Sequence, residues 1–409
     1  MLWVTVLIAA PALDASAQTR LTEFAYRGFA DVGFVAYPQE APNDPIHVVA
    51  DGQFRVEPSV RVRRVFSLAA SLEARVASHD QTEADFAYWD RTIRRPAFAI
   101  RSLTATIVKS RVTLEVGKQF VRWGQSDIIS PTDHFTARDY LVTTSSEVLA
   151  TTAARLTYAA PGDALEFVYT PRMTPSRMPL LDQRWVGLQA AVPGVRLVDG
   201  DIRYPGGPQY GARWRHVGSR VEFSASFFKG FNHLALLDVT VPATRDAAFI
   251  GRRHAAIRAW GADAVAPLPG VTMKAEATWQ QATAKDADDY GLWVVQAERQ
   301  QADWLLIGGY VGEWVSAERG ALSFAPDRGL AKSVIGRVSR ALEGNRSFFV
   351  EVVARQNADG LYAKAEYSHG IASHWRVAFQ AQLIRGRVDD FLGQYRLNSW
   401  TGARTRFNF

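Results

Sequence analysis

Residues 400–409 of this 409-residue chain read WTGARTRFNF. Arg404 and Arg406 lie on one parity of the stretch, and Phe407 and Phe409 on the other, so the pattern predicts a β-strand with one polar and one apolar face. A final strand that stops on an aromatic residue is typical of an outer-membrane β-barrel. We expect Phe407 and Phe409 to be the signal that the barrel-assembly machinery recognises.

The opposite end of the chain predicts export. An apolar run over 2–12 is followed by Ala-Ser-Ala at 15–17, an A-x-A cleavage pattern, although no Lys or Arg precedes the run. We therefore expect a signal peptide over 1–17 and a single β-barrel domain over 18–409. Beyond that segment no stretch approaches the ~18–20 apolar residues of a transmembrane helix, and the absence of cysteine agrees with export without disulfides.

Alternation with a period of two dominates the chain. Over 54–62, 66–76, 221–227 and 271–280, apolar side chains occupy one parity and polar or ionised ones the other. Such long dyads suit strands with lipid on one face and water on the other. A secreted β-propeller or β-helix is the soluble alternative, but no blade or solenoid repeat of fixed period is present.

The connections between these runs alternate in length. Very short turns are expected at 62–65, 109–110, 160–163, 217–219, 266–270, 343–345 and 370–373. Longer polar stretches are expected near 38–52, 79–96, 122–148, 171–207, 230–250 and 316–330. This alternation is typical of an up-and-down barrel with short periplasmic turns and long extracellular loops.

The resulting fold class is an all-β transmembrane antiparallel barrel of about 18 strands in the bacterial outer membrane. Strands are expected near 27–37, 53–62, 65–78, 97–108, 111–122, 149–160, 163–171, 208–217, 219–230, 251–263, 270–282, 289–299, 302–314, 331–342, 345–357, 359–369, 372–386 and 396–409. Sixteen strands is an alternative count, because the region 283–302 is weakly bounded and 184–198 could add a hairpin. Tryptophans near strand ends are expected at the lipid headgroups: Trp89, Trp123, Trp185, Trp293, Trp304, Trp314, Trp375 and Trp400.

One local motif is more specific than the architecture. Residues 117–127 read GKQFVRWGQSD and are followed by PTD at 131–133 and ARDY at 137–140. This segment resembles a motif of large outer-membrane barrels, the alginate-export-like porins and their uncharacterised relatives, in which a strand ending G-[KR]-Q-x-V-x-W-G enters a loop containing N/S-P-x-D. The resemblance covers this segment only. It implies a large barrel that conducts or exports a solute, and it carries no substrate.

The parity of the strands predicts which side chains line the lumen. Acids such as Glu73 and Glu276 are expected there, but cations outnumber them, so we expect an anion-selective pore. The simpler interpretation is that Arg–Glu pairs on neighbouring strands only stiffen the wall. The predicted lumen cations are Arg55, Arg61, Arg63, Arg75, Arg213, Arg215, Lys274, Arg355, Lys364, Arg376, Arg404 and Arg406.

The segment 122–148 is the longest loop-like region with convergent polar groups. We expect it to fold inward as a constriction, because a mobile external loop has little use for its apolar side chains; an ordered external brace is the alternative. The predicted constriction residues are Trp123, Asp127, Asp133, His134, Arg138 and Asp139.

Catalysis is not expected. His134 lies near Ser130 and Asp133, but adjacent residues rarely converge as a triad, and no hydrolase, metalloprotease or nucleotide-binding motif is present. Asp286, Asp288 and Asp289 form a short acidic cluster that is more typical of a solvated turn than of a calcium site. No metal or cofactor is therefore expected.

These features together predict an outer-membrane channel that passes or exports a polar, anionic solute by diffusion. The alternative is a plugged barrel that serves as a scaffold or as the outer component of a multi-protein export pathway. Expected partners are outer-membrane lipid, the barrel-assembly machinery and a small polar or anionic solute. The net charge of +6 is spread along the chain without a basic run, so nucleic acid is not an expected partner.

Overall fold

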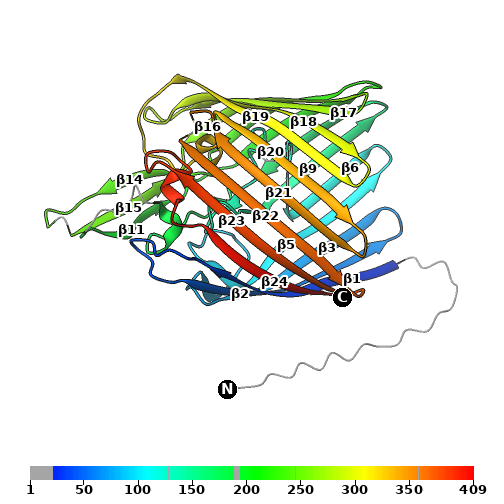
Figure 1. The fold of residues 1–409 in the computed structure, drawn as a ribbon. Coiled ribbons are helices and arrows are strands. Elements are labelled where there is room, and N and C mark those ends of the chain that lie inside the picture. Colours follow the sequence, from blue (N-terminus) through cyan, green and yellow to red (C-terminus); the bar gives the residue numbers. More distant parts are fainter. Residues whose placement is uncertain (1–21, 128, 188–193, 245, 358) are drawn as a thin grey trace.

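The computed structural model describes residues 22–127, 129–187, 194–244, 246–357 and 359–409 (Figure 1). The expected signal peptide lies outside the described residues. No helix in the described ranges is long and apolar enough to cross a membrane.

The main sheet is an antiparallel barrel closed on itself. Its 19 strands are the eighteen of the barrel and β4 (Thr82–Ala87), which pairs parallel to β5 within a long loop. Closure is made by β1 against β24, from Phe29 opposite Asn408 to Ala36 opposite Thr401. The barrel strands are β1 (Thr22–Ala36), β2 (Val48–Val62), β3 (Phe66–Ala77), β5 (Arg95–Lys109), β6 (Val112–Gln119), β9 (Thr151–Ala160), β10 (Asp163–Thr170), β12 (Gln209–Val217), β13 (Glu222–Phe231), β16 (Ala256–Leu268), β17 (Val271–Ala282), β18 (Asp289–Gln301), β19 (Trp304–Ala317), β20 (Ser333–Leu342), β21 (Arg346–Arg355), β22 (Gly360–Ile371), β23 (Trp375–Gly386) and β24 (Trp400–Asn408).

The predicted count of 18 strands is confirmed, and the alternative of 16 is wrong. The tenth barrel strand, however, covers 256–268 and not 251–263. The reason is that β15 (Ala247–Arg253) pairs instead with β14 (Leu236–Thr240) and with β11 (Arg196–Arg203) in a separate three-stranded sheet. This sheet projects from the end of the barrel that carries the long loops (Figure 1). Of the region 184–198, the described residues 184–187 and 194–198 contain no barrel strand.

Short elements lie in the long loops. They are β7 (Arg138–Asp139), β8 (Glu147–Val148), the 3₁₀ turns Arg184–Val186 and Gly393–Tyr395, and α1 (Pro326–Gly329).

The two faces of the strands differ as a membrane barrel requires. On β1, Val32 and Phe34 are 66% and 52% exposed, whereas Asp31, which has the opposite parity, is 2% exposed. Val76 and Phe379, on distant strands, are 68% and 58% exposed. An apolar outer face on every side of a closed barrel faces lipid, and the inner face is polar. The protein is an outer-membrane β-barrel.

Some of the tryptophans expected at the lipid headgroups lie on the outer face of the barrel, and others lie inside it. Trp314 and Trp375 are exposed on the outer face, as expected. Trp123, Trp185 and Trp400 are at most 6% exposed, so their assignment to the headgroup level is wrong. The reason is that Trp123 and Trp185 belong to loops packed inside the barrel and Trp400 joins the same interior cluster as Trp185.

Candidate functional site

The lumen is occupied by the connection between β6 and β9, which we call the inward loop (residues 120–150). Its apolar side chains are buried although they belong to no barrel strand: Val121, Trp123 and Ile129 are 2% exposed and Leu141 is 1% exposed. Their partners lie on the inner faces of strands on several sides of the barrel. The loop therefore crosses the interior.

Glu276 of β17 anchors the tip of this loop to the wall. One carboxylate oxygen accepts hydrogen bonds from the N–H groups of Gln125 and Ser126, at 2.9 and 3.0 Å. The other accepts from the N–H and the hydroxyl of Thr132, at 2.9 and 2.8 Å. Gly261 of the neighbouring β16 allows this approach, because a Cβ there would lie 2.7 Å from the Thr132 methyl group. Four bonds to one carboxylate fix the loop tip on this side of the lumen.

An acidic group lies beside this anchor. The Asp127 carboxylate is 2.8 Å from the Lys274 ammonium, which is also 2.8 Å from Glu298 of β18. Burial alone would raise the pKa of Asp127, but hydrogen bonds from Lys274 and Gln296 lower it overall. Together with Glu276, these carboxylates outnumber the single lysine.

Aromatic packing holds the middle of the loop on β10, β12 and β13. The Phe135 ring lies 5.2 Å from that of Trp123 and 4.9 Å from that of Phe228, both edge to face. Gly211 of β12 makes the space, since a Cβ there would lie 2.5 Å from the Trp123 ring. The Asp133 carboxylate accepts the N–H groups of Trp123 and Gly124, at 2.5 and 2.8 Å.

His134 belongs to the same packed region. Its ring stacks on Phe228 with centroids 5.3 Å apart, and its Nε2 is 2.9 Å from the Thr278 hydroxyl. Burial lowers its pKa to about 4, because the charged form would be desolvated. His134 is therefore neutral at pH 7.

Part of the inner wall is apolar beneath the loops. Val294, Val311 and Ile335 point inward and are at most 1% exposed, packed with Ile129 of the inward loop and with Trp185. Apolar side chains on the inside of a barrel reach such burial only when another segment covers them. Water is therefore kept from this patch of the inner wall on β18–β20.

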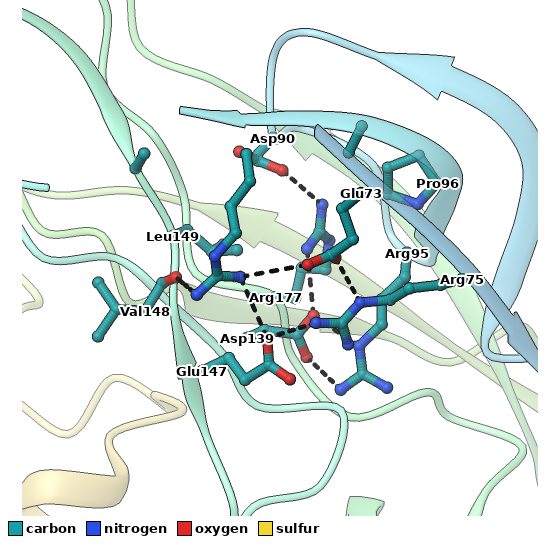
Figure 2. A pocket seen from close by; sticks show the side chains of 13 residues that line it. Glu73, Arg75, Asp90, Arg95, Pro96, Asp139, Glu147, Val148, Leu149 and Arg177 are labelled. Carbon is teal, nitrogen blue, oxygen red and sulfur yellow. Dashed lines mark hydrogen bonds and ion pairs between the residues drawn. The ribbon is translucent and has the colours of Figure 1, made fainter. Parts of the chain in front are cut away.

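The second half of the inward loop is held by a buried ionic network (Figure 2). Asp139 receives both arms of the Arg95 fork at 2.9 Å and Arg177 at 3.1 Å. Arg177 also lies 3.0 Å from Asp90, which is 2.7 Å from Lys118. Burial opposes ionisation of Asp139, but Arg95 and Arg177 more than offset it, so its pKa is well below the usual range.

A neighbouring group extends this network to β2 and β3. Glu73 pairs with Arg55 at 2.5 Å and also with Arg75, while Arg75 reaches Glu147 of the inward loop at 2.5 Å. Arg101 lies 3.1 Å from Glu147. The cavity between these groups is only about 30 Å³, room for about one water molecule, so the network acts as a brace between strands and loops.

The wall formed by β23, β24 and β1 carries Arg376, Arg404 and Arg406 on its inner face. Arg404 pairs with Asp31 and Asp51, at 2.5 and 2.7 Å, and Arg406 with Asp31 at 2.6 Å. Arg376 lies directly opposite Arg406 in register. Its guanidinium contacts the Ser368 hydroxyl at 2.6 Å, and no carboxylate of the described residues lies within 4 Å of it.

The predicted lumen cations fall into three groups. Arg63 lies in the turn between β2 and β3, with φ of 51°, and not on a strand wall; that assignment is wrong because β2 ends at Val62. Arg61 and Arg215 lie near the short-turn end, beside Glu23 and Glu222 at 3.8 Å. The remainder share the inner-facing parity of their strands. They are Arg55, Arg75, Arg213, Lys274, Arg355, Lys364, Arg376, Arg404 and Arg406.

Sequence reasoning missed most of the carboxylates that partner these cations. Arg213 lies 3.2 Å from Asp263, and Arg355 lies 2.9 Å from Asp390. The lumen is therefore more nearly balanced in charge than the strand parity suggested. Arg95, Arg101, Lys118 and Arg177 were also missed. Arg95 and Lys118 lie at the ends of β5 and β6 that meet the long loops, Arg101 lies within β5, and Arg177 lies in the loop after β10.

The predicted constriction residues are brought together only in part. Trp123, Asp133 and His134 share one packed region, whereas Asp127 contacts β17 and β18 and Asp139 lies in the ionic network described above. The Arg138 N–H donates to the Ser176 hydroxyl at 2.8 Å, which ties the inward loop to the next long loop.

The residues considered for chemistry do not converge. The Ser130 hydroxyl donates to the Ser126 carbonyl at 3.0 Å, away from His134, which contacts Thr278. The acidic cluster forms separate ion pairs with different arginines. They are Asp286 with Arg253, Asp288 with Arg328, and Asp289 with Arg319.

No protein-family model matches the chain, and no curated protein matches it. Solved structures do. OccAB4 of Acinetobacter baumannii is similar with a TM-score of 0.58 at 9% identity, over 95% of this chain and 98% of that one. A BenF-like porin from Pseudomonas fluorescens Pf-5 gives 0.57 at 8%, and OpdQ of Pseudomonas aeruginosa 0.53 at 9%, with the same coverage.

The chain has a porin fold. Identities this low establish the architecture alone, so the alginate-export-like motif at 117–140 remains a local resemblance.

Proposed function

We propose that this porin-fold barrel is a diffusion channel for small polar solutes that carry an anionic group. The observation that carries the proposal is the arginine wall on β23 and β24. The side chains of Arg404 and Arg406 remain 30% and 39% exposed despite their ion pairs, and Arg376 adds a guanidinium with no carboxylate partner among the described residues. Guanidinium forks match carboxylate or phosphate oxygens, and cationic linings favour anions.

The opposite side of the lumen supports this proposal. There the carboxylates of Asp127, Glu276 and Glu298 lie around Lys274, and Arg337 of β20 also acts on Asp127. Acidic groups therefore outnumber cations around the tip of the inward loop. An anionic solute would be drawn along the arginine wall and away from the tip of the inward loop. The likeness to a protein described as a porin supports a channel through its fold.

A second candidate is a plugged barrel that serves as a scaffold or as the outer component of an export pathway. It is favoured by the buried apolar inner wall beneath Ile129 and Trp185. The motif at 117–140, which resembles that of alginate-export-like porins, fits this candidate as well.

In either case we propose that the barrel-assembly machinery recognises the C-terminal strand. Phe407 lies on the outer face of β24 with its ring 5.0 Å from that of Trp375, and Phe409 exchanges backbone hydrogen bonds with Gly28. An aromatic outer face at the closing strand supports this assignment.

The test of the channel proposal is the reversal potential of the refolded protein in a planar bilayer under a KCl gradient. We expect anion selectivity that falls in Arg376→Gln. This position is chosen over Arg404 because removing Arg404 would leave Asp31 with fewer cations. Arg220→Gln, in the exposed turn between β12 and β13, is the control and should not change selectivity.

Each alternative outcome is distinct. Cation selectivity of the wild type would contradict the anionic solute, and selectivity unchanged in Arg376→Gln would contradict the role of the arginine wall. No conductance would favour the plugged barrel.

A further inference from the structure

The outer face of the barrel carries a row rich in aromatic residues near the end with the long loops. The cross-strand register links positions from β10 to β19 through successive neighbours. The Phe227 and Trp260 rings lie 5.7 Å apart, and those of Trp279 and Trp314 lie 5.3 Å apart. Aromatic rings on the outer face gather where hydrocarbon meets headgroups. The row consists of Phe167, Ala212, Phe227, Trp260, Trp279, Gly291 and Trp314.

A second row, made of polar residues, lies nearer the long loops. On each strand it is two residues away from the first row, toward the loop end. It begins with Tyr169 and Tyr210, whose rings are 5.5 Å apart. Lys229, Arg258 and Gln281 continue it in register on β13, β16 and β17. The strands β16 and β17 are labelled in Figure 1. This row is at the height where lipid headgroups begin.

Lys229 and Arg258 are directly opposite each other in this row and both are exposed. Directly opposed residues have Cβ atoms ~4.5–5.5 Å apart, and like charges at that distance destabilise a sheet. Within the described part of the chain, neither side chain has a carboxylate within 4 Å. The lumen is different, because there most arginines have an acidic partner.

We propose that Lys229 and Arg258 bind the phosphate groups of a phosphorylated glycolipid in the outer leaflet. An opposed pair of cations at the hydrocarbon boundary requires an external anion, and phosphate is the anion that the leaflet supplies at this height. Arg258 offers a fork that matches phosphate oxygens and Lys229 a compact ammonium. Tyr210 and Gln281, the neighbours on either side, can donate further hydrogen bonds.

The aromatic row completes the site. Phe227 and Trp260 lie directly below the two cations, on the same strands and the same face, where the acyl chains of a lipid bound by its phosphates would run. The site would therefore contact both the diphosphorylated headgroup and the acyl chains of one lipid. This proposal does not depend on whether the lumen conducts.

The test uses the refolded full chain in a non-ionic detergent, titrated with diphosphoryl lipid A and followed by native mass spectrometry. Two cations near an anionic lipid surface should make Lys229→Gln/Arg258→Gln bind about 30-fold more weakly than the wild type. The control is Lys332→Gln/Arg385→Gln, which removes the same charge from exposed positions near the same end of the barrel. This control should bind as the wild type does.

Further arms make the test decisive. Lipid A without phosphates should bind the wild type as weakly as diphosphoryl lipid A binds the double variant. Equal affinity of the wild type and the double variant would overturn the proposal, and so would an equal loss in the control, which would indicate general charge attraction. Circular dichroism and heat-modifiable electrophoretic mobility establish that both variants are folded barrels.

Discussion

Replacing Glu276 by glutamine should release the tip of the inward loop. The carboxylate accepts hydrogen bonds through both oxygens, two from Gln125 and Ser126 and two from Thr132. An amide has only one oxygen, so in either orientation its NH₂ group faces donors on one side. At ~1–3 kcal/mol for each buried donor that loses its acceptor, two such losses cost about 2–6 kcal/mol of the free energy that docks the loop.

Two measurements report the release. In a planar bilayer, the single-channel conductance and its noise should rise in Glu276→Gln, because the loop tip leaves the lumen. Limited trypsin digestion should cut after Arg122 or Arg138 faster than in the wild type, and this readout does not require an open pore. Trypsin accessibility therefore reports release of the inward loop whether the barrel is plugged or open.

Glu366→Gln provides the matched control. Glu366 is an inner-wall carboxylate of β22 that accepts a hydrogen bond from Gln380 of β23 at 2.6 Å, and no described loop residue hydrogen-bonds to it. This variant should keep the wild-type conductance noise and trypsin resistance. Unchanged conductance and unchanged proteolysis in Glu276→Gln would refute the anchoring role.

Three further predictions address the brace, a buried histidine and the closing strand. Asp139→Asn leaves Arg95 and Arg177 without their shared carboxylate and should destabilise the barrel by about 3–5 kcal/mol, measured by urea unfolding; an unchanged midpoint would contradict the bracing role. Folding lowers the pKa of His134 from 6.5 to about 4, so the unfolded chain binds a proton that the folded loop excludes: stability should fall as pH drops from 6.5 to 4, by on the order of 3 kcal/mol, and His134→Gln should flatten unfolding curves over that window. Deleting Phe409 should reduce the amount of assembled barrel in the outer membrane while refolding in detergent persists, and normal assembly in cells would argue against recognition through this residue.

Much of the fold could be predicted because its signals are local. Alternation of side chains and the short turns such as 109–110 and 343–345 indicate where strands begin and end. The prediction failed at 251–253, where the residues alternate equally well but pair with β14 and β11 outside the barrel. A strand pattern identifies an extended segment, and it carries no information about its neighbour.

The candidate site was predictable only in outline. The motif at 117–140 and its apolar side chains indicated that this loop packs against something, and parity indicated an inner-facing Glu276. The bond between Glu276 and Thr132 joins residues 144 positions apart, and no local pattern encodes such a pair.

Strand periodicity, turn length and the two-faced alternation act within a few residues, so the sequence alone was enough to predict a membrane barrel of about 18 strands, with 16 as the alternative. Only the tertiary structure decided which carboxylates partner the lumen cations, where the inward loop is anchored, and that Lys229 and Arg258 meet on the lipid face without an acid beside them. The physical reason is that closing the barrel sets the register between strands, and that register determines which charges become neighbours.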